Sequence, residues 1–213
     1  LGEIEEQLGD LHAAKAAYAQ SLAICQQLHT SLGDSPQVLR DLSVSLSKLG
    51  KIEQRLGDLH AAKASYSQSL AIRQQLHTSF GDSPPVLRGL SVSLSNLGEI
   101  EQQLGDLHAA KAAYTQSLAI DQQLHTSLGD SPPVLRDLSV SFIKLGDIEQ
   151  QLGDLHAAKA AYAQSLAISS NCTPASAIHR KCYATYRCRS LNLARLNSNS
   201  AIYMLPKPPT LKV

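Results

Sequence analysis

Histidine is the residue type whose spacing first suggests chemistry. Seven histidines form two sets that repeat every 48 residues, namely His12, His60, His108 and His156, then His29, His77 and His125. A ladder of metal sites is one interpretation, because imidazole is a common metal ligand. Metal sites on helices usually place a second ligand three or four residues away. No second His lies at that spacing from any of the seven, and no Cys follows one of them at it. We therefore expect no metal site and interpret these histidines as solvent-facing or helix-capping.

The motif Asp-Ser-Pro occurs three times, and a nucleophilic serine is one interpretation of it. Its copies occupy residues 34–36, 82–84 and 130–132. A serine directly before proline is more typical of the residue that caps a helix N-terminus. No histidine and acid present themselves as partners of these serines in a catalytic triad. The Gly-Asp-Leu segments also lack the spacing of a phosphate-binding loop. The sequence therefore predicts neither an enzyme active site nor a bound cofactor.

Composition excludes further classes of protein. No run of about eighteen residues is apolar, so we expect no transmembrane helix. Only 4% of the 213 residues are aromatic, which is low for an all-β fold. Leu1 opens the chain and no signal peptide follows it, so we expect a cytoplasmic protein. Residues 1–168 contain 12 basic and all 18 acidic residues, without a basic stripe, so nucleic acid is not an expected partner.

Most of the chain is one repeated unit. The segment LGDLHAAKA recurs with a fixed period of 48, and its copies start at Leu8, Leu56, Leu104 and Leu152. Residues 1–48 agree with residues 97–144 at 42 of 48 positions and with residues 49–96 at 38. A partial fourth copy covers residues 145–168. We therefore expect one repeat array over residues 1–168, followed by a separate tail.

Cys25 is the single cysteine of the array. The later copies fill its position with Arg73, Asp121 and Ser169. Because such different side chains replace one another there, we expect the position to lie on the surface and the thiol to be non-catalytic.

Each copy predicts two helices joined by a short turn. From Ser83, a suitable N-cap, apolar residues recur at steps of three and four up to Leu104, and Gly105 then ends the first helix. Asp106 is a suitable cap for a second helix, which Gly129 ends. Neither helix can bury its apolar stripe alone, whereas stacked hairpins can. We expect an all-α fold with a truncated first helix and seven full ones, six of them over residues 36–56, 58–80, 84–104, 106–128, 132–152 and 154–168.

The pattern LG-x-I-x3-LGDL-x2-A-x3-Y-x2-S resembles the tetratricopeptide repeat signature across residues 1–168. The residues that fall at the family's spacing in one copy are Leu97-Gly98, Gly105, Ala110, Tyr114 and Ser117. The resemblance implies a right-handed solenoid of antiparallel hairpins, and a close approach through Ala110 would account for Gly98. The family's usual tyrosine is replaced by Glu53, Glu101 and Glu149. The period of 48 exceeds the usual length of about 34, which indicates a variety with longer helices.

In tetratricopeptide arrays the first helix of each hairpin lines the concave face, which binds peptides or partner helices. The resemblance therefore implies a non-catalytic protein–protein interaction protein, a scaffold or the sensing part of a larger multidomain protein. Carried over by spacing, its groove consists of Val44, Ser47, Lys51, Gln54, Arg55, Val92, Ser95, Glu99, Gln102, Gln103, Val140, Ile143, Asp147, Gln150 and Gln151. The copies differ at several of these positions. Such variation is predicted by a binding groove and equally by drift on a solvated face.

Residues 169–213 differ from everything before them. They contain seven basic residues, no acidic ones and three of the four cysteines. A basic binding tail and a zinc site are two interpretations. A third interpretation accounts for the whole segment. Codons can be chosen for these residues such that the same bases, read from two bases later, encode 44 residues of the repeat beginning Gln-Gln-Leu-His. We therefore interpret the tail as a frameshifted repeat of irregular structure, without a zinc site.

The frameshift admits a second hypothesis for the whole chain, namely a pseudogene or misassembled fragment of a larger tetratricopeptide protein without independent function. An out-of-frame tail also supplies no capping repeat, so the last hairpin would leave apolar surface uncovered. Exposed apolar surface at the ends of an array favours self-association.

Overall fold

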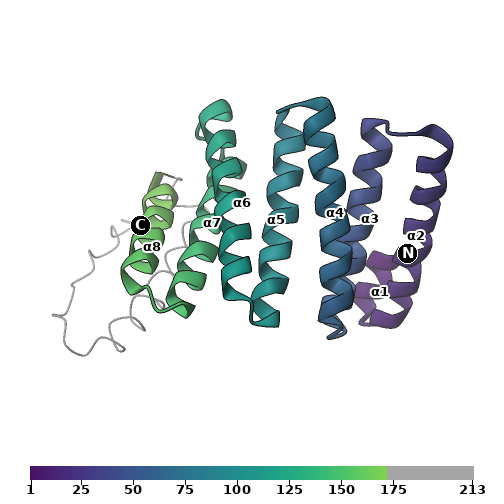
Figure 1. Ribbon diagram of the computed structural model, residues 1–213, viewed down its shortest axis with the longest axis horizontal. Helices are drawn as coiled ribbons and strands as arrows, with labels where there is room; N and C mark the ends of the chain where they lie inside the picture. Colours follow the sequence, from purple (N-terminus) through teal and green to yellow (C-terminus); the bar gives the residue numbers. More distant parts are fainter. Residues whose placement is uncertain (172–213) are drawn as a thin grey trace, which may run out of the picture.

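The structure is a computed structural model that describes residues 1–171. Within that range eight α-helices and no strands follow one another along the array (Figure 1). They are α1 (Gly2–Leu8), α2 (Leu11–Leu32), α3 (Pro36–Arg55), α4 (Leu59–Phe80), α5 (Pro84–Leu104), α6 (Leu107–Leu128), α7 (Pro132–Gln151) and α8 (Leu155–Asn171). The all-α fold, with seven full helices after a short first one, is thus confirmed.

The helix boundaries follow the sequence closely, since each of the six predicted helices begins and ends within three residues of its predicted position. The largest difference is at α8, which continues beyond Ile168 to Asn171. Ser169 supports this extension, because its Oγ donates a hydrogen bond to the Ser165 carbonyl at 2.8 Å and lies 3.2 Å from Ser139 Oγ on α7. The interpretation of the tail as a frameshifted, irregular segment lies, from residue 172 onward, outside the described residues.

Polar caps and glycines separate the helices. Asp106 caps α6 by accepting a hydrogen bond from the Ala109 amide at 2.9 Å. Gly105 ends α5 in the left-handed conformation, with φ of 87°, as expected. Ser83 lies at the N-cap position of α5, but its side chain makes no capping hydrogen bond. The Val86 amide, which such a cap would use, donates instead to the Ser83 carbonyl at 2.9 Å.

The two helices of each hairpin meet where a tyrosine ring lies on a glycine. A Cβ built on Gly98 of α5 would lie 2.7 Å from Tyr114 Cε1 of α6, closer than packed carbon atoms approach. The same contact recurs between Gly2 and Tyr18, Gly50 and Tyr66, and Gly146 and Tyr162. The predicted close approach at Gly98 therefore exists, but naming Ala110 as its partner was wrong. Ala110 is instead buried with Tyr114 against Ile148 of α7.

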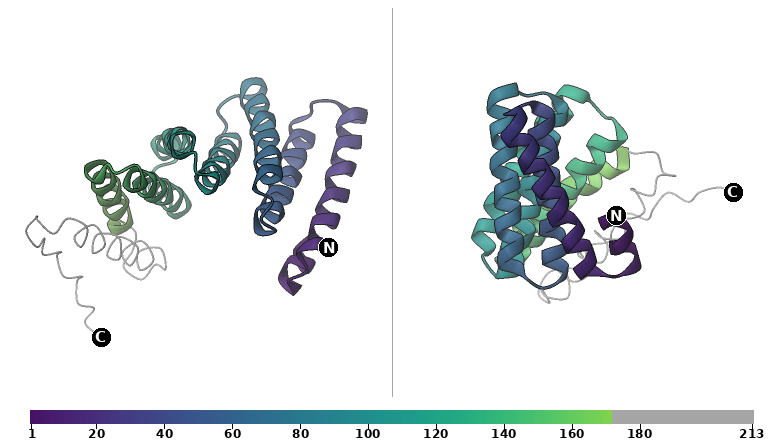
Figure 2. Two further views of the ribbon diagram at one scale, coloured as in Figure 1. Left: turned by 60° about the horizontal axis from the view of Figure 1, so that its bottom comes forward. Right: turned by 90° about the vertical axis from the view of Figure 1, so that its right-hand side faces the viewer.

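Each hairpin buries its second helix against the next hairpin. Ala62 and Tyr66 of α4 pack on Ile100 of α5, and equivalent clusters recur between α2 and α3 and between α6 and α7. Successive hairpins are rotated relative to one another, so the array is a twisted stack (Figure 2). Leu28 is 45% exposed on α2, whereas Leu76, its counterpart on α4, is 2% exposed between α3 and α5. The core is therefore produced by stacking and is continuous along the array.

The contact between Gly98 and Tyr114 predicts that Gly98→Ala lowers the stability of the protein, whereas helix propensity alone would predict an increase. On an open helix surface Gly98→Ala would add about 1 kcal/mol to stability. Because the new methyl overlaps the Tyr114 ring, we expect the free energy of unfolding to fall by about 1–3 kcal/mol instead, as measured by urea denaturation. In a Tyr114→Ala background the same substitution should carry no penalty. A penalty of equal size in both backgrounds would show that the ring does not set the distance between the helices.

Candidate functional site

The fifteen predicted groove residues lie on the first helices of three successive hairpins. Five lie on each of α3, α5 and α7, and none of them is buried. Val44, Val92 and Val140 occupy one position of the repeat and are 38%, 52% and 41% exposed. Valine is usually an interior residue, so this face presents an exposed apolar position in each of the three copies.

Tyrosine hydroxyls hold three groove glutamines in place. The hydrogen bonds, of 3.0–3.1 Å, run from Tyr66 to Gln54, from Tyr114 to Gln102 and from Tyr162 to Gln150. Burial raises the pKa of Tyr66 to about 12 and also raises the pKa of Tyr114, so these hydroxyls stay protonated and donate at neutral pH. The rings that lie on the helix glycines thus also fix polar groups on the groove face.

Several cations at the N-terminal end of the groove are paired within the chain. Glu6 of α1 accepts a hydrogen bond from Lys51 Nζ at 2.7 Å and one from Arg55 Nη1 at 2.8 Å. The hydrogen bond from Lys51, together with the charges of both cations, lowers the pKa of the Glu6 carboxyl. Lys48 pairs in the same way with Glu3, at 2.6 Å. These side chains line a cavity of about 390 Å³ between α1, α2 and α3.

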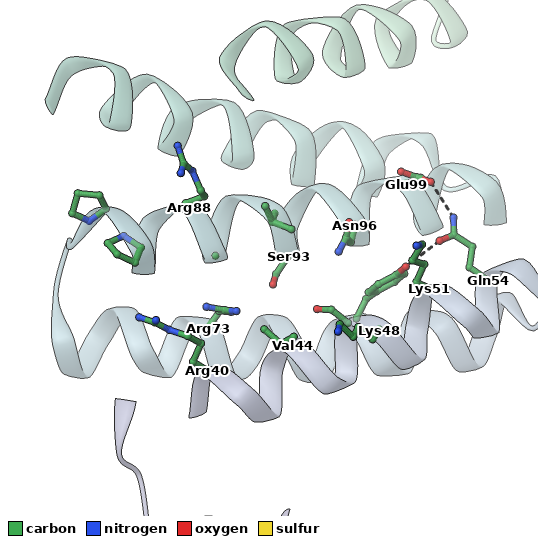
Figure 3. A pocket seen from close by; sticks show the side chains of 16 residues that line it. Arg40, Val44, Lys48, Lys51, Gln54, Arg73, Arg88, Ser93, Asn96 and Glu99 are labelled. Atoms are coloured by element: carbon green, nitrogen blue, oxygen red, sulfur yellow. Dashed lines mark hydrogen bonds between the residues drawn. The ribbon is translucent and has the colours of Figure 1, made fainter. Parts of the chain in front are cut away.

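A larger cavity of about 740 Å³ opens between α3, α4 and α5 (Figure 3). Its lining includes six of the predicted groove residues, namely Val44, Ser47, Lys51, Gln54, Val92 and Glu99. The other nine, among them all five on α7, do not line it. Gln54 donates a hydrogen bond to Glu99 at 3.1 Å at one end of the cavity, and Arg40 and Arg73 lie at the other (Figure 3).

The glutamates that replace the signature tyrosine are buried, and each pairs with a lysine of the preceding hairpin. Glu101 is 6% exposed, and its Oε1 lies 2.8 Å from Lys63 Nζ on α4. The equivalent pairs are Lys15 with Glu53, at 3.2 Å, and Lys111 with Glu149, at 2.8 Å. These carboxylates therefore join consecutive hairpins and do not face the groove cavity.

The position of Cys25 was predicted to lie on the surface, and this prediction is wrong. Cys25 is half-buried, and its counterparts Arg73, Asp121 and Ser169 are 9%, 4% and 0% exposed. Serines on the neighbouring first helices serve this position: Ser91 and Ser141 both donate to the Asp121 carboxylate, and Ser45 Oγ lies 3.4 Å from Cys25 Sγ. Because hydroxyls both donate and accept, serines suit both a thiol and a carboxylate at this position. The variation among near-identical copies could have drawn attention to this position. It reflects different side-chain chemistry at a shared place between helices and does not indicate exposure to solvent.

Three of the seven repeated histidines contact acids at the ends of helices. His29, His77 and His125 lie in the last turns of α2, α4 and α6, where each Nε2 lies 2.6–2.7 Å from an aspartate of the following turn. His12, His60, His108 and His156 are exposed. Within residues 1–171 no three His, Cys, Asp or Glu side chains gather into a metal-binding group. In the same part of the chain no helix has the length and apolar character needed to cross a membrane.

Antiparallel hairpins in near-identical copies, with a core that exists only between neighbours, define a helical-repeat solenoid. The family model described as Tetratricopeptide repeat matches residues 1–28, 45–76, 92–124 and 140–172, so the chain belongs to the tetratricopeptide repeat family. The resemblance seen in the sequence is thereby confirmed. Such repeats imply a protein–protein interaction scaffold, and the fold is typically non-enzymatic.

Solved structures share the fold at low sequence identity. BtubC (BKLC) from P. vanneervenii is 18% identical, with a TM-score of 0.66 over 100% of this chain and 84% of that one. A kinesin light chain-like protein with nearly identical TPR-like repeats from Podosopora anserina is 19% identical, with a TM-score of 0.63 over 92% and 91%. MamA is 15% identical, with a TM-score of 0.52 over 94% and 98%. At these identities the likeness establishes the fold alone. No curated protein sequence matches the chain.

The buried carboxyl of Asp121 predicts a pH-dependent stability. Desolvation raises its pKa in the folded state, against the opposing hydrogen bonds from Ser141 and Ser91. The charged form therefore lowers stability at neutral pH, and this penalty disappears as the pH falls through the folded-state pKa. We expect Asp121→Ser to raise the free energy of unfolding by about 0.5–2 kcal/mol at pH 7. The gain should vanish below about pH 4, where aspartate is protonated in the unfolded chain too.

Urea denaturation of both chains between pH 3 and pH 7 measures this difference. Cys25→Ser, at the same position of the first copy, is the matched control. Because it removes no carboxyl, its difference in free energy of unfolding from the parent chain should not depend on pH in that range. A gain for Asp121→Ser that is equally large at both ends of the range, or a loss at pH 7, contradicts the prediction.

Proposed function

We propose that the protein binds an extended segment of a partner protein across the fifteen groove residues of α3, α5 and α7. The observation that carries the proposal is the row of exposed valines, one on each of these helices. A row of apolar positions at equal spacing offers repeated contacts to an extended chain, and the polar residues beside it offer hydrogen bonds. The glutamines held by tyrosine hydroxyls support this, because fixed polar groups lose little side-chain entropy on binding.

The variation between copies supports a ligand with a direction. Lys51, Glu99 and Asp147 occupy the same position of successive copies, so the charge at that position changes sign along the array. Charge complementarity favours one orientation and one register of a bound chain. We propose that the array serves in this way as the scaffolding or sensing part of a larger multidomain protein, a role typical of long helical-repeat arrays.

A peptide selection tests the proposed groove. Peptides are selected from a random displayed library on the full chain, and their dissociation constants are measured by calorimetry. The double variant Lys51→Glu with Arg55→Glu reverses two groove charges and should weaken most selected peptides at least tenfold. The matched control is His60→Glu with His108→Glu, which adds acids at the exposed N-terminal turns of α4 and α6, where they suit the helix dipole. Peptides indifferent to the groove variant, or equally sensitive to both, would place binding elsewhere.

The second hypothesis is that the chain is a pseudogene product or misassembled fragment of a larger tetratricopeptide protein. The specific observation that favours it is the codon reading of residues 169–213, in which 44 shifted codons are compatible with the repeat. Sequencing the gene and its transcript through the codon of Ser169 tests it. A transcript that carries one base fewer than the in-frame repeat supports a genuine frameshift. A transcript with the repeat frame intact shows that the tail is not the natural product.

A further inference from the structure

Arg73 of α4 places a buried guanidinium at the groove without a protein partner. Its side chain is 9% exposed, and within residues 1–171 it makes no hydrogen bond or ion pair. Arginine stays charged in proteins, and burying an unpaired charge is costly. Burial lowers the pKa of Arg73, and the charge of Arg40 adds to the effect, so the surroundings supply no compensating anion. The counterparts of Arg73 in the first and third copies, Cys25 and Asp121, contact serines.

The guanidinium lines one end of the 740 Å³ cavity, beside a second arginine that has no partner within the described residues. Arg40 of α3 is exposed, and its side chain ends next to that of Arg73 (Figure 3). The remaining cations of the cavity are already paired. Arg88 lies 3.3 Å from Asp137, Lys48 pairs with Glu3 and Lys51 pairs with Glu6. Among the described residues that line the cavity, Glu99 is the only acid, and it lies at the opposite end (Figure 3).

A glycine next to Arg73 creates the space that the guanidinium occupies. Gly89 of α5 stands where the first and third copies carry Asp41 and Asp137. A Cβ on Gly89 would overlap Arg73 Nη1. Two of the differences between the second copy and its neighbours therefore lie next to each other, and one adds a cation while the other removes an acid.

The second copy as a whole is also more positively charged than the other two full copies. Residues 49–96 contain five basic and three acidic residues, whereas residues 1–48 and residues 97–144 each contain three basic and six acidic ones. Most of the residues that line the cavity belong to this copy, which is the one full copy of the repeat with more bases than acids.

We propose that this cavity binds an oxyanion, a carboxylate or a phosphate, through Arg73 of the second copy and Arg40 of the first. A guanidinium fork matches either group with two parallel hydrogen bonds. The volume of about 740 Å³ admits an acidic side chain together with the chain that carries it. The inference rests on the proposed groove and specifies its ligand as a segment whose acidic group lies beside Val44 and Val92, which line the same cavity.

Inorganic phosphate is the direct probe of the site. It is titrated into the full chain at constant ionic strength, and the Arg73 Nε–Hε signal is followed by NMR, assigned by its loss in Arg73→Ser. The fourth copy carries serine at this position, so the variant should fold, and circular dichroism checks its helicity. We expect a saturable shift of that signal with phosphate and none with chloride. A shift that does not saturate, or an equal one with chloride, overturns the proposal.

Selected peptides identify the source of the oxyanion. One acidic peptide is compared with versions that carry glutamine or phosphoserine in place of its key glutamate. On the parent chain the glutamine version should bind at least tenfold more weakly than the better of the other two, and that difference should disappear in Arg73→Ser. The tighter of the glutamate and phosphoserine versions then names the source. Equal binding of all three versions to the parent chain contradicts the site.

Two substitutions at Gly89 form a matched pair of further tests. Gly89→Asp restores the acid of the neighbouring copies next to Arg73, whereas Gly89→Asn adds nearly the same volume without charge. We expect the aspartate to abolish the discrimination between glutamate and glutamine peptides and the asparagine to retain part of it. Equal effects would exclude a charge-based site. Peptides that depend on Lys51 and Arg55 but ignore Arg73→Ser would refute the oxyanion site alone, and peptides that ignore every variant would refute the groove itself.

Discussion

The contact between a tyrosine ring and a glycine backbone sets the geometry on which the rest of the array depends. Because Gly98 has no side chain, the ring of Tyr114 lies directly on α5, and α6 comes correspondingly close. That approach buries Ala110 and Tyr114 together against Ile148 of the following hairpin. The hydroxyl of the same ring reaches the groove face and holds Gln102. One side chain thus determines the distance within a hairpin, takes part in the interface between hairpins and fixes a polar group on the surface.

Because the copies are nearly identical and share one backbone arrangement, a difference between two copies can be interpreted like a point substitution. The position shared by Cys25, Arg73 and Asp121 keeps its place between helices while its chemistry changes from thiol to cation to carboxylate. Serine hydroxyls contact the thiol and the carboxylate, since they donate to Asp121 and one lies near the sulfur of Cys25. In the second copy the change extends to a neighbour, because Gly89 yields the space that Arg73 fills. Substitutions between copies are therefore most informative where the substituted residues are neighbours, as Arg73 and Gly89 are.

Much of the fold could be predicted from the sequence, because the periodic information is local. Gly105 and Asp106 mark a helix end and a helix start within two residues, and the period of 48 fixes every later boundary. Which of two residues on a facing helix fills the gap at Gly98 is not local information, so Ala110 was named where Tyr114 lies. Substitution at the Cys25 position was interpreted as exposure for a similar reason, since the serines that serve it lie twenty or more residues away in the chain.

The candidate site was predictable only as a face of three helices. Spacing placed all fifteen residues on α3, α5 and α7, where the structure leaves them accessible. It did not predict that Lys51 and Arg55 both reach back to Glu6, a contact made across more than forty residues. Arg73 was missed because it belongs to a second helix, and its importance follows from burial without a partner, which a sequence does not display.

The buried pairs of glutamate with the lysine of the preceding hairpin also bear on how such an array changes length. Lys63 with Glu101 and Lys111 with Glu149 are the same joint made twice, with the same 2.8 Å separation. A tandem duplication of one whole 48-residue unit adds a lysine and a glutamate that meet the existing partners on either side, so no buried carboxylate is left without a cation. A partial duplication that adds the glutamate of one joint without the lysine of another leaves a buried carboxylate unpaired, at the cost that an unpaired buried charge carries. Unequal recombination between the copies can therefore vary their number in whole steps while every joint stays satisfied.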